Sequence, residues 1–338
     1  MIAPIVDGLI DRGLGAVLGS ACGDALGAGY EFTNPGPGAA IDMVGGGVFG
    51  WEPGEWTDDT QMALGILDVL AERCDPAARG SAAGWPVDVE AIGMNFLAWA
   101  ASGPADIGNQ TAAVLYATDN PADLAAMSAA YQDSAGNSIG NGGLMRTAPV
   151  ALAALHDRDV VAALASDVTA LTHAHANSVA ACVLWSEAIR RAVVEANPNK
   201  PFDFAACIRD GLDLVDGERR EQWSKLVEQA VEGPPAIFNP NGWVVTAFQA
   251  ALSAIVHTPV PEDEPSKHLV DALEAAIRIG HDTDTVAAIA GGLLGARWGA
   301  SAVPDRWQSI LHGRRRSGES VVEAIDLEAL TRRAMSGY

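Results

Sequence analysis

Two short acidic clusters, far apart in the chain, carry the residue types most suited to chemistry. Residues 56–60 read Trp-Thr-Asp-Asp-Thr, and residues 280–285 read Gly-His-Asp-Thr-Asp-Thr. Each cluster places two carboxylates and neighbouring hydroxyl groups at the start of an apolar, helix-like stretch. Such oxygen ligands are the ones that hard ions such as Mg²⁺, Mn²⁺ and Ca²⁺ prefer. If folding brings the clusters together, they can hold divalent metal.

Each cluster also has a simpler explanation as the start of a helix. Thr57 is a good N-cap, and Asp58 and Asp59 would complement the helix dipole from the first turn. The recurrence of the pattern favours metal, because four carboxylates in one place repel one another unless cations neutralise them. A carboxylate-bridged pair of ions can orient substrate oxygens and activate water. Zinc is not expected, because neither a His-x-x-x-His pair nor a cysteine cluster accompanies the acids.

Helices are predicted to position these clusters. Nearly every periodic segment has helical spacing, and no convincing alternating strand is found. Glycine recurs at every fourth position from Gly15 to Gly27, which predicts that another backbone approaches this helix closely. We expect a single, compact all-α domain over residues 1–338. The expected helices span residues 7–28, 57–73, 88–101, 120–132, 146–155, 158–171, 172–196, 202–215, 218–232, 242–257, 267–280, 284–298 and 319–335, and the expected loops include 33–56, 75–87 (a surface insertion) and 136–146.

The composition excludes several classes of partner. The 338 residues include 43 acidic and 21 basic side chains, a formal net charge of −22. This balance argues against binding to nucleic acid or to an anionic membrane surface. No basic segment followed by an apolar run opens the chain, and none of the four cysteines belongs to a Cys-x-x-Cys pair. We therefore expect a cytoplasmic protein without disulfides and without a membrane partner.

Five motifs share an order along the chain that is more specific than any one of them. They are residues 23–27 (Gly-Asp-Ala-Leu-Gly) with Glu31, 56–60, 140–146 (Gly-Asn-Gly-Gly-Leu-Met-Arg), 172–173 (Thr-His) and 280–285. Together they resemble the ADP-ribosylglycohydrolase family, which includes dinitrogenase-reductase-activating glycohydrolases and hydrolases of ADP-ribosyl-arginine and ADP-ribosyl-serine. The resemblance covers about residue 12 to about residue 304. It implies a compact all-α fold with two Mg²⁺ or Mn²⁺ ions in a cleft.

The resemblance also implies roles for the two clusters. The implied substrate is ADP-ribose in glycosidic linkage to a protein side chain, and the implied product is ADP-ribose. As a hypothesis, metal-activated water attacks C1″ of the ribose, and Asp58 or Asp282 accepts its proton. The metal ligands implied by the resemblance are Thr57, Asp58, Asp59, Asp282, Asp284 and Thr285.

Two acids outside the clusters are candidates for assisting the reaction. By the resemblance, Glu31 matches a loop glutamate that gates or assists the site, and the alternative is an exposed loop acid. Asp106 matches an acid that contacts the ribose or a guanidinium leaving group, and the alternative is a helix N-cap. Asp24 is instead expected to be a buried structural partner, with Arg146 as its partner.

Substrate contacts are expected from a glycine-rich loop and one histidine. The loop around Asn141, Gly142 and Gly143 offers backbone N–H groups that suit a diphosphate, although it can equally be a tight turn. His173 can hydrogen-bond the ribose or be structural, whereas His175 is expected to be structural. The expected partners are therefore an ADP-ribosylated protein and ADP-ribose.

Three functions stay open at this point. The first is removal of ADP-ribose from arginine side chains. The second is the same chemistry on serine-linked, nucleic-acid-linked or small-molecule ADP-ribose. The third is a non-catalytic ADP-ribose binder or structural relative. The presence of all four cluster aspartates favours an enzyme.

Overall fold

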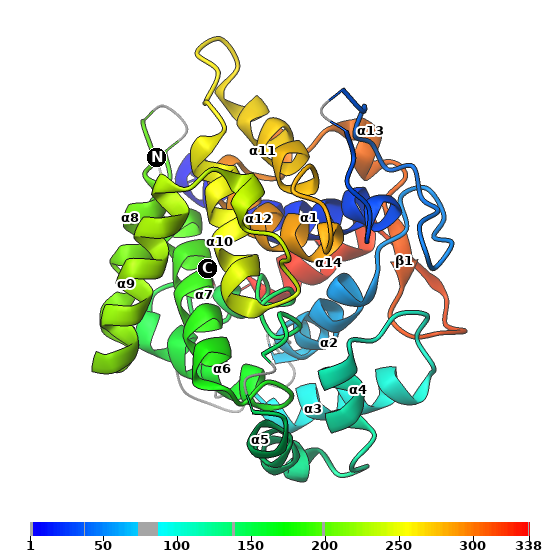
Figure 1. Cartoon of the computed structure of the whole chain (residues 1–338). Helices are drawn as coiled ribbons and strands as arrows, with labels where there is room; N and C mark the ends of the chain where they lie inside the picture. Colours follow the sequence, from blue (N-terminus) through cyan, green and yellow to red (C-terminus); the bar gives the residue numbers. More distant parts are fainter. Residues whose placement is uncertain (1–2, 37, 74–86, 137–138, 198–199, 337) are drawn as a thin grey trace.

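Helices make up most of the computed structural model, which describes residues 3–36, 38–73, 87–136, 139–197, 200–336 and 338 (Figure 1). The expected surface insertion falls outside the described residues, except for residue 87. The elements are α1 (Ala3–Gly27), α2 (Asp58–Arg73), α3 (Val89–Ala101), α4 (Asn109–Leu115), α5 (Leu124–Ala135), α6 (Arg158–Ala170), α7 (Ala176–Glu195), α8 (Phe204–Arg209), α9 (Gly217–Glu232), α10 (Val244–His257), α11 (His268–Ile277), α12 (Thr283–Trp298), α13 (Asp305–Gln308), β1 (His312–Arg314), β2 (Val321–Glu323) and α14 (Ala324–Ala334). The predicted all-α class is confirmed.

The pair formed by α1 and α12 is the centre of the fold. A methyl group on Gly19 would overlap the carbonyl oxygen of Gly291, and one on Gly15 would overlap that of Gly295. The glycines of α1 thus let the two backbones touch, as their spacing predicts. At the end of the pair, Gly27 abuts the backbone of Asp284, so the C-terminus of α1 meets the N-terminus of α12.

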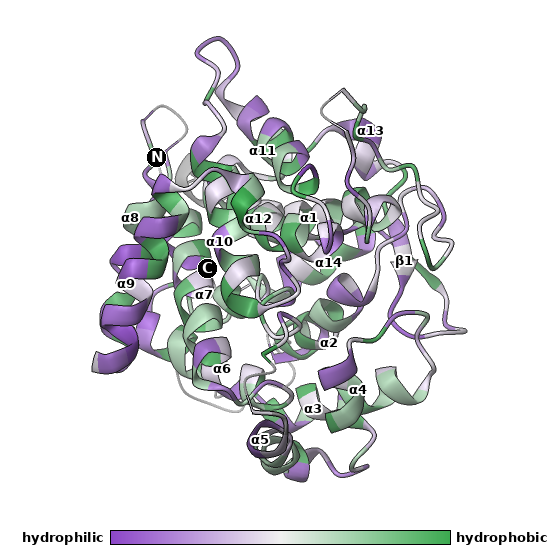
Figure 2. Ribbon diagram, in the orientation of Figure 1, coloured by the Kyte–Doolittle hydropathy of each residue, from purple (hydrophilic) through white to green (hydrophobic). Residues whose placement is uncertain are grey.

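The other helices pack around this pair. Every residue of α12 from Thr283 to Arg297 is buried, and α12 contacts α1, α7, α10 and α11. Helices α6–α9 lie on one side and α3–α5 at the bottom of the molecule as drawn (Figure 1). Hydrophobic residues line the inner helices, whereas hydrophilic residues gather on the outer face of α9 and on loops (Figure 2). This arrangement leaves the acidic ends of α2 and α12 inside the protein.

A small hairpin corrects the expectation of a helix over residues 319–335 and of a chain without strands. Strand β1 pairs antiparallel with β2, and α14 begins only at Ala324. Valines at 321 and 322 suit a strand better than a helix. Strand β1 also supports the first acidic cluster, because Trp56 N donates to His312 O at 3.0 Å and a side chain on Gly313 would overlap the Trp56 indole.

The predicted helix over residues 146–155 is also wrong. This segment forms successive turns and one short 3₁₀ helix, Val150–Leu152. Its bonds run from residue i+3 to residue i, as in Val150 N to Thr147 O at 3.0 Å. Pro149 lacks an N–H and disfavours helical geometry in the residue before it, which explains the break. Similarly, the helix expected over residues 202–215 stops at Arg209.

Three cysteines, Cys22, Cys182 and Cys207, are free and buried, in keeping with the expectation for those residues. Among the described helices, none combines the length and the apolar character needed to span a bilayer.

Candidate metal and substrate site

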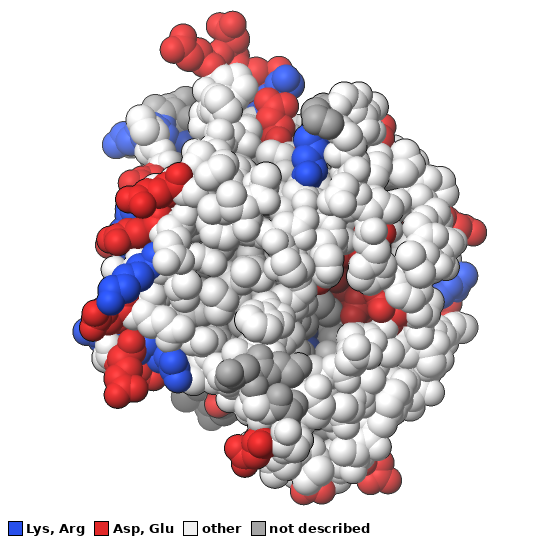
Figure 3. Space-filling model, in the orientation of Figure 1, with Lys and Arg blue, Asp and Glu red and all other residues white. Residues whose placement is uncertain are grey.

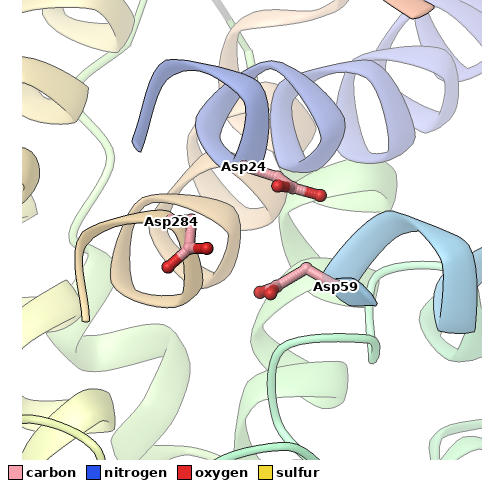
Figure 4. Close-up of side chains that lie close together, drawn as sticks. All are labelled: Asp24, Asp59 and Asp284. Carbon is pink, nitrogen blue, oxygen red and sulfur yellow. The ribbon is translucent and has the colours of Figure 1, made fainter. Parts of the chain in front are cut away.

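The two acidic clusters lie face to face in the folded chain. Asp58 and Asp59 occupy the first turn of α2, and Asp284 occupies the first turn of α12. The close packing of α1 against α12 brings the start of α12 beside the end of α1, where Asp24 lies. Figure 4 shows Asp24, Asp59 and Asp284 pointing toward one another from these three helices. Three elements distant in sequence therefore build one centre.

Short distances join the two clusters. Asp59 Oδ2 accepts a hydrogen bond from Thr57 Oγ1 and another from Thr285 Oγ1, each at 3.3 Å. One carboxylate oxygen from each of Asp24, Asp59 and Asp284 lies within 4.8 Å of the others. The centre is thus a compact set of oxygen atoms with α2 on one side and α12 on the other.

A second carboxylate group adjoins the first and shares one member with it. Carboxylate oxygens of Glu31, Asp282 and Asp284 also lie within 4.8 Å of one another. Phe32 N donates to His281 O at 2.6 Å, which holds the segment carrying Glu31 against the second cluster. Asp284 therefore stands between the two groups. This arrangement has the form that a carboxylate shared by two cations would require.

Asp24 is buried, but the predicted partner is wrong. Its carboxylate accepts from Thr57 N at 2.9 Å and from Thr60 N and Thr60 Oγ1 at 3.0 and 2.6 Å. It therefore caps the N-terminus of α2 from a neighbouring helix, where a negative charge complements the helix dipole. Arg146 instead donates to Thr172 Oγ1 at 2.6 Å. Asp24 could not be found as a cap from sequence, because it lies 33 residues before Thr57.

The crowding of carboxylates raises their pKa values. Burial, followed by repulsion from neighbouring acids, raises the pKa values of Asp58, Asp59 and Asp284 well above the ordinary range. Burial also raises the pKa of Asp24 to about 6, although the hydrogen bonds from residues 57 and 60 oppose this shift. Without counter-charge, deprotonating the whole centre is costly, and bound cations would remove that cost.

The residues present fit divalent metal. Within the described part of the chain, the buried atoms Asp59 Oδ1 and Glu31 Oε2 have no hydrogen-bond partner. A buried carboxylate oxygen without a donor is expensive; a cation would satisfy that of Asp59, whereas Glu31 can keep a proton because its pKa is raised to about 8. The centre offers carboxylate and hydroxyl oxygens, the ligands suited to Mg²⁺, Mn²⁺ or Ca²⁺. The chain thus contains a buried acidic centre that can hold metal.

A cavity of about 340 Å³ opens onto this centre. Its lining includes Asp58, Asp282, Asp284 and Thr285, four of the predicted ligands. In Figure 3 carboxylates appear at the bottom of a hollow whose surroundings are mostly uncharged. A ligand in the cavity would therefore reach the acidic centre from solvent.

The predicted acids outside the clusters also line this cavity. Glu31 is buried rather than exposed, and Asp106 is half-buried. Burial, with repulsion from Asp106, Asp282 and Asp24, raises the pKa of Glu31 to about 8. Burial and repulsion from Asp282 raise the pKa of Asp106 to about 6. Without bound metal, Glu31 therefore keeps its proton at neutral pH, which is the property required of an acid catalyst, whereas Asp106 is mostly ionised there.

The glycine-rich loop around Asn141 forms another wall of this cavity. Gly140, Asn141 and Gly142 line the cavity, whereas Gly143 packs behind them against His173. Asn141 Nδ2 donates to Asp282 Oδ2 at 2.8 Å, which joins this wall to the second acidic cluster. Among the described residues, the N–H groups of Gly142 and Gly143 have no hydrogen-bond acceptor. The N–H group of Gly142, which lines the cavity, is free to bind a ligand oxygen.

His173 borders the same cavity, while His175 does not. Burial and, secondarily, the charge of Arg146 lower the pKa of His173 to about 3, so its ring is neutral. His175 caps α7 by accepting from Asn177 N at 3.0 Å, a structural role as expected. His173 is therefore placed to contact a ligand without carrying charge.

Sequence reasoning missed three residues that line the cavity or hold its walls. Asn241 is fully buried; its Oδ1 accepts from Asp282 N at 3.0 Å and its Nδ2 donates to Gly280 O at 3.1 Å. Gln110 Oε1 accepts from Gly140 N at 3.1 Å and holds the glycine loop. Trp243 lines the cavity mouth and is 59% exposed. The Asn-Pro-Asn-Gly sequence before Trp243 predicts a turn, but it does not indicate which residues that turn contacts in the folded protein.

Comparisons with known proteins agree with this architecture. A solved structure described as an ADP-ribosylglycohydrolase-related protein complex superposes with a TM-score of 0.74 at 28% identity, over 98% of this chain and 99% of that one. An ADP-ribosyl-[dinitrogen reductase] glycohydrolase from Rhodospirillum rubrum is 30% identical, over 89% of this chain and 90% of its own. An ADP-ribosylarginine hydrolase from Pseudomonas putida is 28% identical, over 88% and 73%. Because the sequence profile described as ADP-ribosylglycohydrolase matches residues 6–336, the chain belongs to the ADP-ribosylglycohydrolase family.

Proposed function

We propose that this protein hydrolyses the N-glycosidic bond between ADP-ribose and the arginine side chain of a modified protein. The main support is that two acidic clusters, more than 200 residues apart in sequence, meet at the bottom of one cavity. Thr285 Oγ1 of one cluster and Asp59 Oδ2 of the other lie 3.3 Å apart. The partners are then an ADP-ribosylated protein and the product ADP-ribose. We further propose that the chain acts as one domain, because its buried apolar residues form one connected cluster.

Two Mg²⁺ or Mn²⁺ ions are proposed to be held by six residues, which are Thr57, Asp58, Asp59, Asp282, Asp284 and Thr285. When bound, such ions orient ribose hydroxyls and lower the pKa of water. Asp284 is suited to contact both, because its oxygens belong to both carboxylate groups. Asp24 is suited to hold the first turn of α2 rather than to bind metal, because residues 57 and 60 already donate four hydrogen bonds to it.

The remaining steps are proton transfers by the chain's own side chains. Asp58 and Asp282 line the cavity and are the candidates for accepting a proton from the water that attacks C1″. As the bond from C1″ to the guanidine nitrogen breaks, that nitrogen needs a proton. Glu31, which lines the cavity and has a raised pKa in the metal-free chain, is the proposed donor of that proton. Asp106 also lines the cavity, and we propose that it contacts the ribose or the guanidinium group.

An arginine linkage is favoured over a serine linkage by charge. The cavity lining contains four acids, Glu31, Asp58, Asp106 and Asp282, in addition to Asp284. An acidic cavity attracts a cationic guanidinium more than a neutral serine oxygen. Names of the relatives point in the same direction, since one is an ADP-ribosylarginine hydrolase. The net charge of −22 argues against a nucleic-acid substrate.

The proposal is tested by hydrolysis of defined arginine-linked and serine-linked ADP-ribosyl peptides. We expect release of ADP-ribose from the arginine linkage with Mg²⁺ or Mn²⁺ and a loss of activity with a chelator. Asp284→Asn is expected to lower kcat at least about a hundredfold, the upper range for disturbed metal sites. Asp159→Asn is the matched control, because Asp159 also lies in the first turn of a helix but is exposed.

Three outcomes would contradict the proposal in different ways. Activity that survives the chelator and Asp284→Asn would refute the metal centre. Faster cleavage of the serine linkage would leave the centre but replace the substrate. Binding of ADP-ribose without cleavage of any linkage would identify a non-catalytic binder.

A further inference from the structure

A buried arginine lies behind the substrate cavity and makes no ion pair with the acidic centre. Arg146 is fully buried, and its guanidinium group stacks 4.4 Å from the centroid of Phe96. Its Nη2 donates to Thr172 Oγ1 at 2.6 Å and to Val168 O at 3.3 Å. An arginine side chain has donors only. The Thr172 hydroxyl must therefore accept from Arg146.

The hydrogen bond from Arg146 to Thr172 determines which ring nitrogen of the neighbouring His173 carries the proton. Thr172 Oγ1 lies 2.7 Å from His173 Nδ1. In the part of the chain that the structure describes, His173 Nδ1 is the remaining polar atom in contact with the Thr172 hydroxyl besides Arg146. The hydroxyl proton consequently has one acceptor, which is Nδ1. A neutral histidine whose Nδ1 accepts a hydrogen bond carries its proton on Nε2.

The opposite tautomer would leave the buried hydroxyl proton of Thr172 without an acceptor. Thr172 has no exposed surface, and His173 is 1% exposed, so water does not replace the missing partner. An unsatisfied buried donor is costly enough to shift such an equilibrium by roughly tenfold or more. Protonation of both ring nitrogens of His173 would likewise leave the Thr172 hydroxyl proton without an acceptor, and it would add a cation beside Arg146. The Nε2–H form is therefore the one that this surrounding selects.

The Nε2 edge of the ring faces the glycine loop of the cavity. A Cβ atom on Gly142 would lie 3.3 Å from His173 Nε2, and one on Gly140 would lie 3.4 Å from it. Gln110 ties these segments together, because its Nε2 donates to Thr172 O at 3.1 Å while its Oε1 accepts from Gly140 N. No described residue accepts a hydrogen bond from His173 Nε2.

We propose that Arg146 and Thr172 are positioning residues that hold His173 as a neutral Nε2–H donor for an acceptor oxygen of the substrate's ADP-ribosyl group. The inference about the substrate rests on the proposed function, but the tautomer does not. His173 then acts as a fixed donor beside the free N–H group of Gly142, and not as a general acid or base. An oxygen-rich ligand with lone pairs, such as a diphosphate, fits these two neighbouring N–H groups.

The tautomer is tested on the substrate-free protein by long-range ¹H–¹⁵N NMR of the histidine rings. Seven histidines give a spectrum simple enough to assign, and His173 is identified by the signal missing from His173→Gln. We expect a protonated Nε2 and an unprotonated Nδ1 at neutral pH. A protonated Nδ1 overturns the proposal, whether or not the protein proves to be a hydrolase.

The hydrogen-bond chain from Arg146 through Thr172 to His173, here called the relay, is tested with two pairs of matched variants. Thr172→Val removes the hydroxyl and is expected to give a mixture of tautomers and a KM for ADP-ribosyl-arginine raised roughly tenfold, with a smaller change in kcat. Thr172→Ser keeps the hydroxyl and should restore both values. A single Nε2–H tautomer with an unchanged KM in Thr172→Val overturns the relay.

The histidine itself offers the second pair. His173→Gln keeps an N–H donor near the position of Nε2, whereas His173→Asn places its amide near Nδ1. We expect His173→Gln to keep KM within about threefold of wild type and His173→Asn to raise it roughly tenfold. Equal KM values in the two variants overturn the donor role. The tautomer is read from the wild-type NMR spectrum, and His173→Gln and His173→Asn each identify the His173 signal, so the assignment needs only one of the two variants to fold.

Discussion

Removal of metal should make the stability of this protein fall as the pH rises. The pKa of Glu31 is raised from its ordinary value of 4.5 to about 8, and those of Asp24 and Asp106 from 3.8 to about 6. Asp59 and Asp284 are raised as well. A carboxyl group with a raised pKa keeps its proton when folded and loses it when unfolded. Rising pH therefore favours the unfolded chain, from the unfolded pKa up to the folded one.

The size of the effect follows from the number of protons retained. Each carboxyl group that is protonated only in the folded state lowers the free energy of unfolding by about 1.4 kcal/mol per pH unit. For Glu31 this window runs from about 4.5 to about 8. A chain of 338 residues has an unfolding entropy of about 0.7 kcal/mol per kelvin, so each retained proton lowers Tm by about 2 °C per pH unit.

The assay compares thermal unfolding of chelator-treated and Mn²⁺-saturated protein between pH 5 and pH 8. We expect Tm of the metal-free protein to fall by several degrees over this range, while bound Mn²⁺ raises Tm most at pH 8. The double variant Asp59→Asn/Asp284→Asn removes two of the raised carboxyl groups and should make the metal-free curve less steep, with the slope from Glu31 remaining; Asp159→Asn should leave the curve unchanged. A metal-free Tm that rises from pH 5 to pH 8 would show that the carboxyl groups are not protonated in the folded protein.

Three substitutions test other parts of the site. Asp24→Asn should cost about 2–4 kcal/mol in urea unfolding, because an amide cannot accept all of the hydrogen bonds donated by α2; a cost below 0.5 kcal/mol would refute the cap. Gly19→Ala should cost about 1–3 kcal/mol by overlap with α12, whereas Gly217→Ala, in open space, should be nearly neutral. Asn141→Ala should raise the Kd for Mn²⁺ at least tenfold in calorimetry by releasing Asp282; unchanged affinity would exclude that role.

Much of the helical framework could be predicted from sequence because its signals are local. Apolar periodicity gives α2, α3, α9 and α10 to within about two residues of their observed ends. The glycine repeat in α1 also predicts a close backbone contact, since four glycines on one stripe have no other use in a helix. The repeat does not indicate which helix makes this contact; in the structure it is α12.

The failures arise where tertiary contacts decide the local structure. Val321 and Val322 pair with Arg314 and Gly313 of β1, and Gly313 packs against the indole of Trp56, which lies far earlier in the chain. In residues 146–155 the apolar pattern favours a helix, whereas Pro149 disfavours one, and the structure follows the proline.

The acidic centre, too, could be predicted from sequence only in part. The residue types of the two clusters indicate metal, and the shared motifs indicate which family to expect. Neither indicates that Asp24 caps α2 from another helix or that Asn241 holds Asp282, because both contacts depend on the three-dimensional path of the chain. The carboxylates could thus be identified from sequence, whereas the side chains that orient them could not.

The central claim is that carboxylates from both ends of the chain hold divalent metal together. It is tested most directly by the number of Mn²⁺ ions bound to chelator-treated protein at pH 7, measured by electron paramagnetic resonance of the free ion. We predict two bound ions in the wild type and loss of both from the high-affinity range in Asp59→Asn/Asp284→Asn. Wild-type protein that binds no Mn²⁺ at micromolar concentration, or a double variant that binds as the wild type does, would contradict the claim.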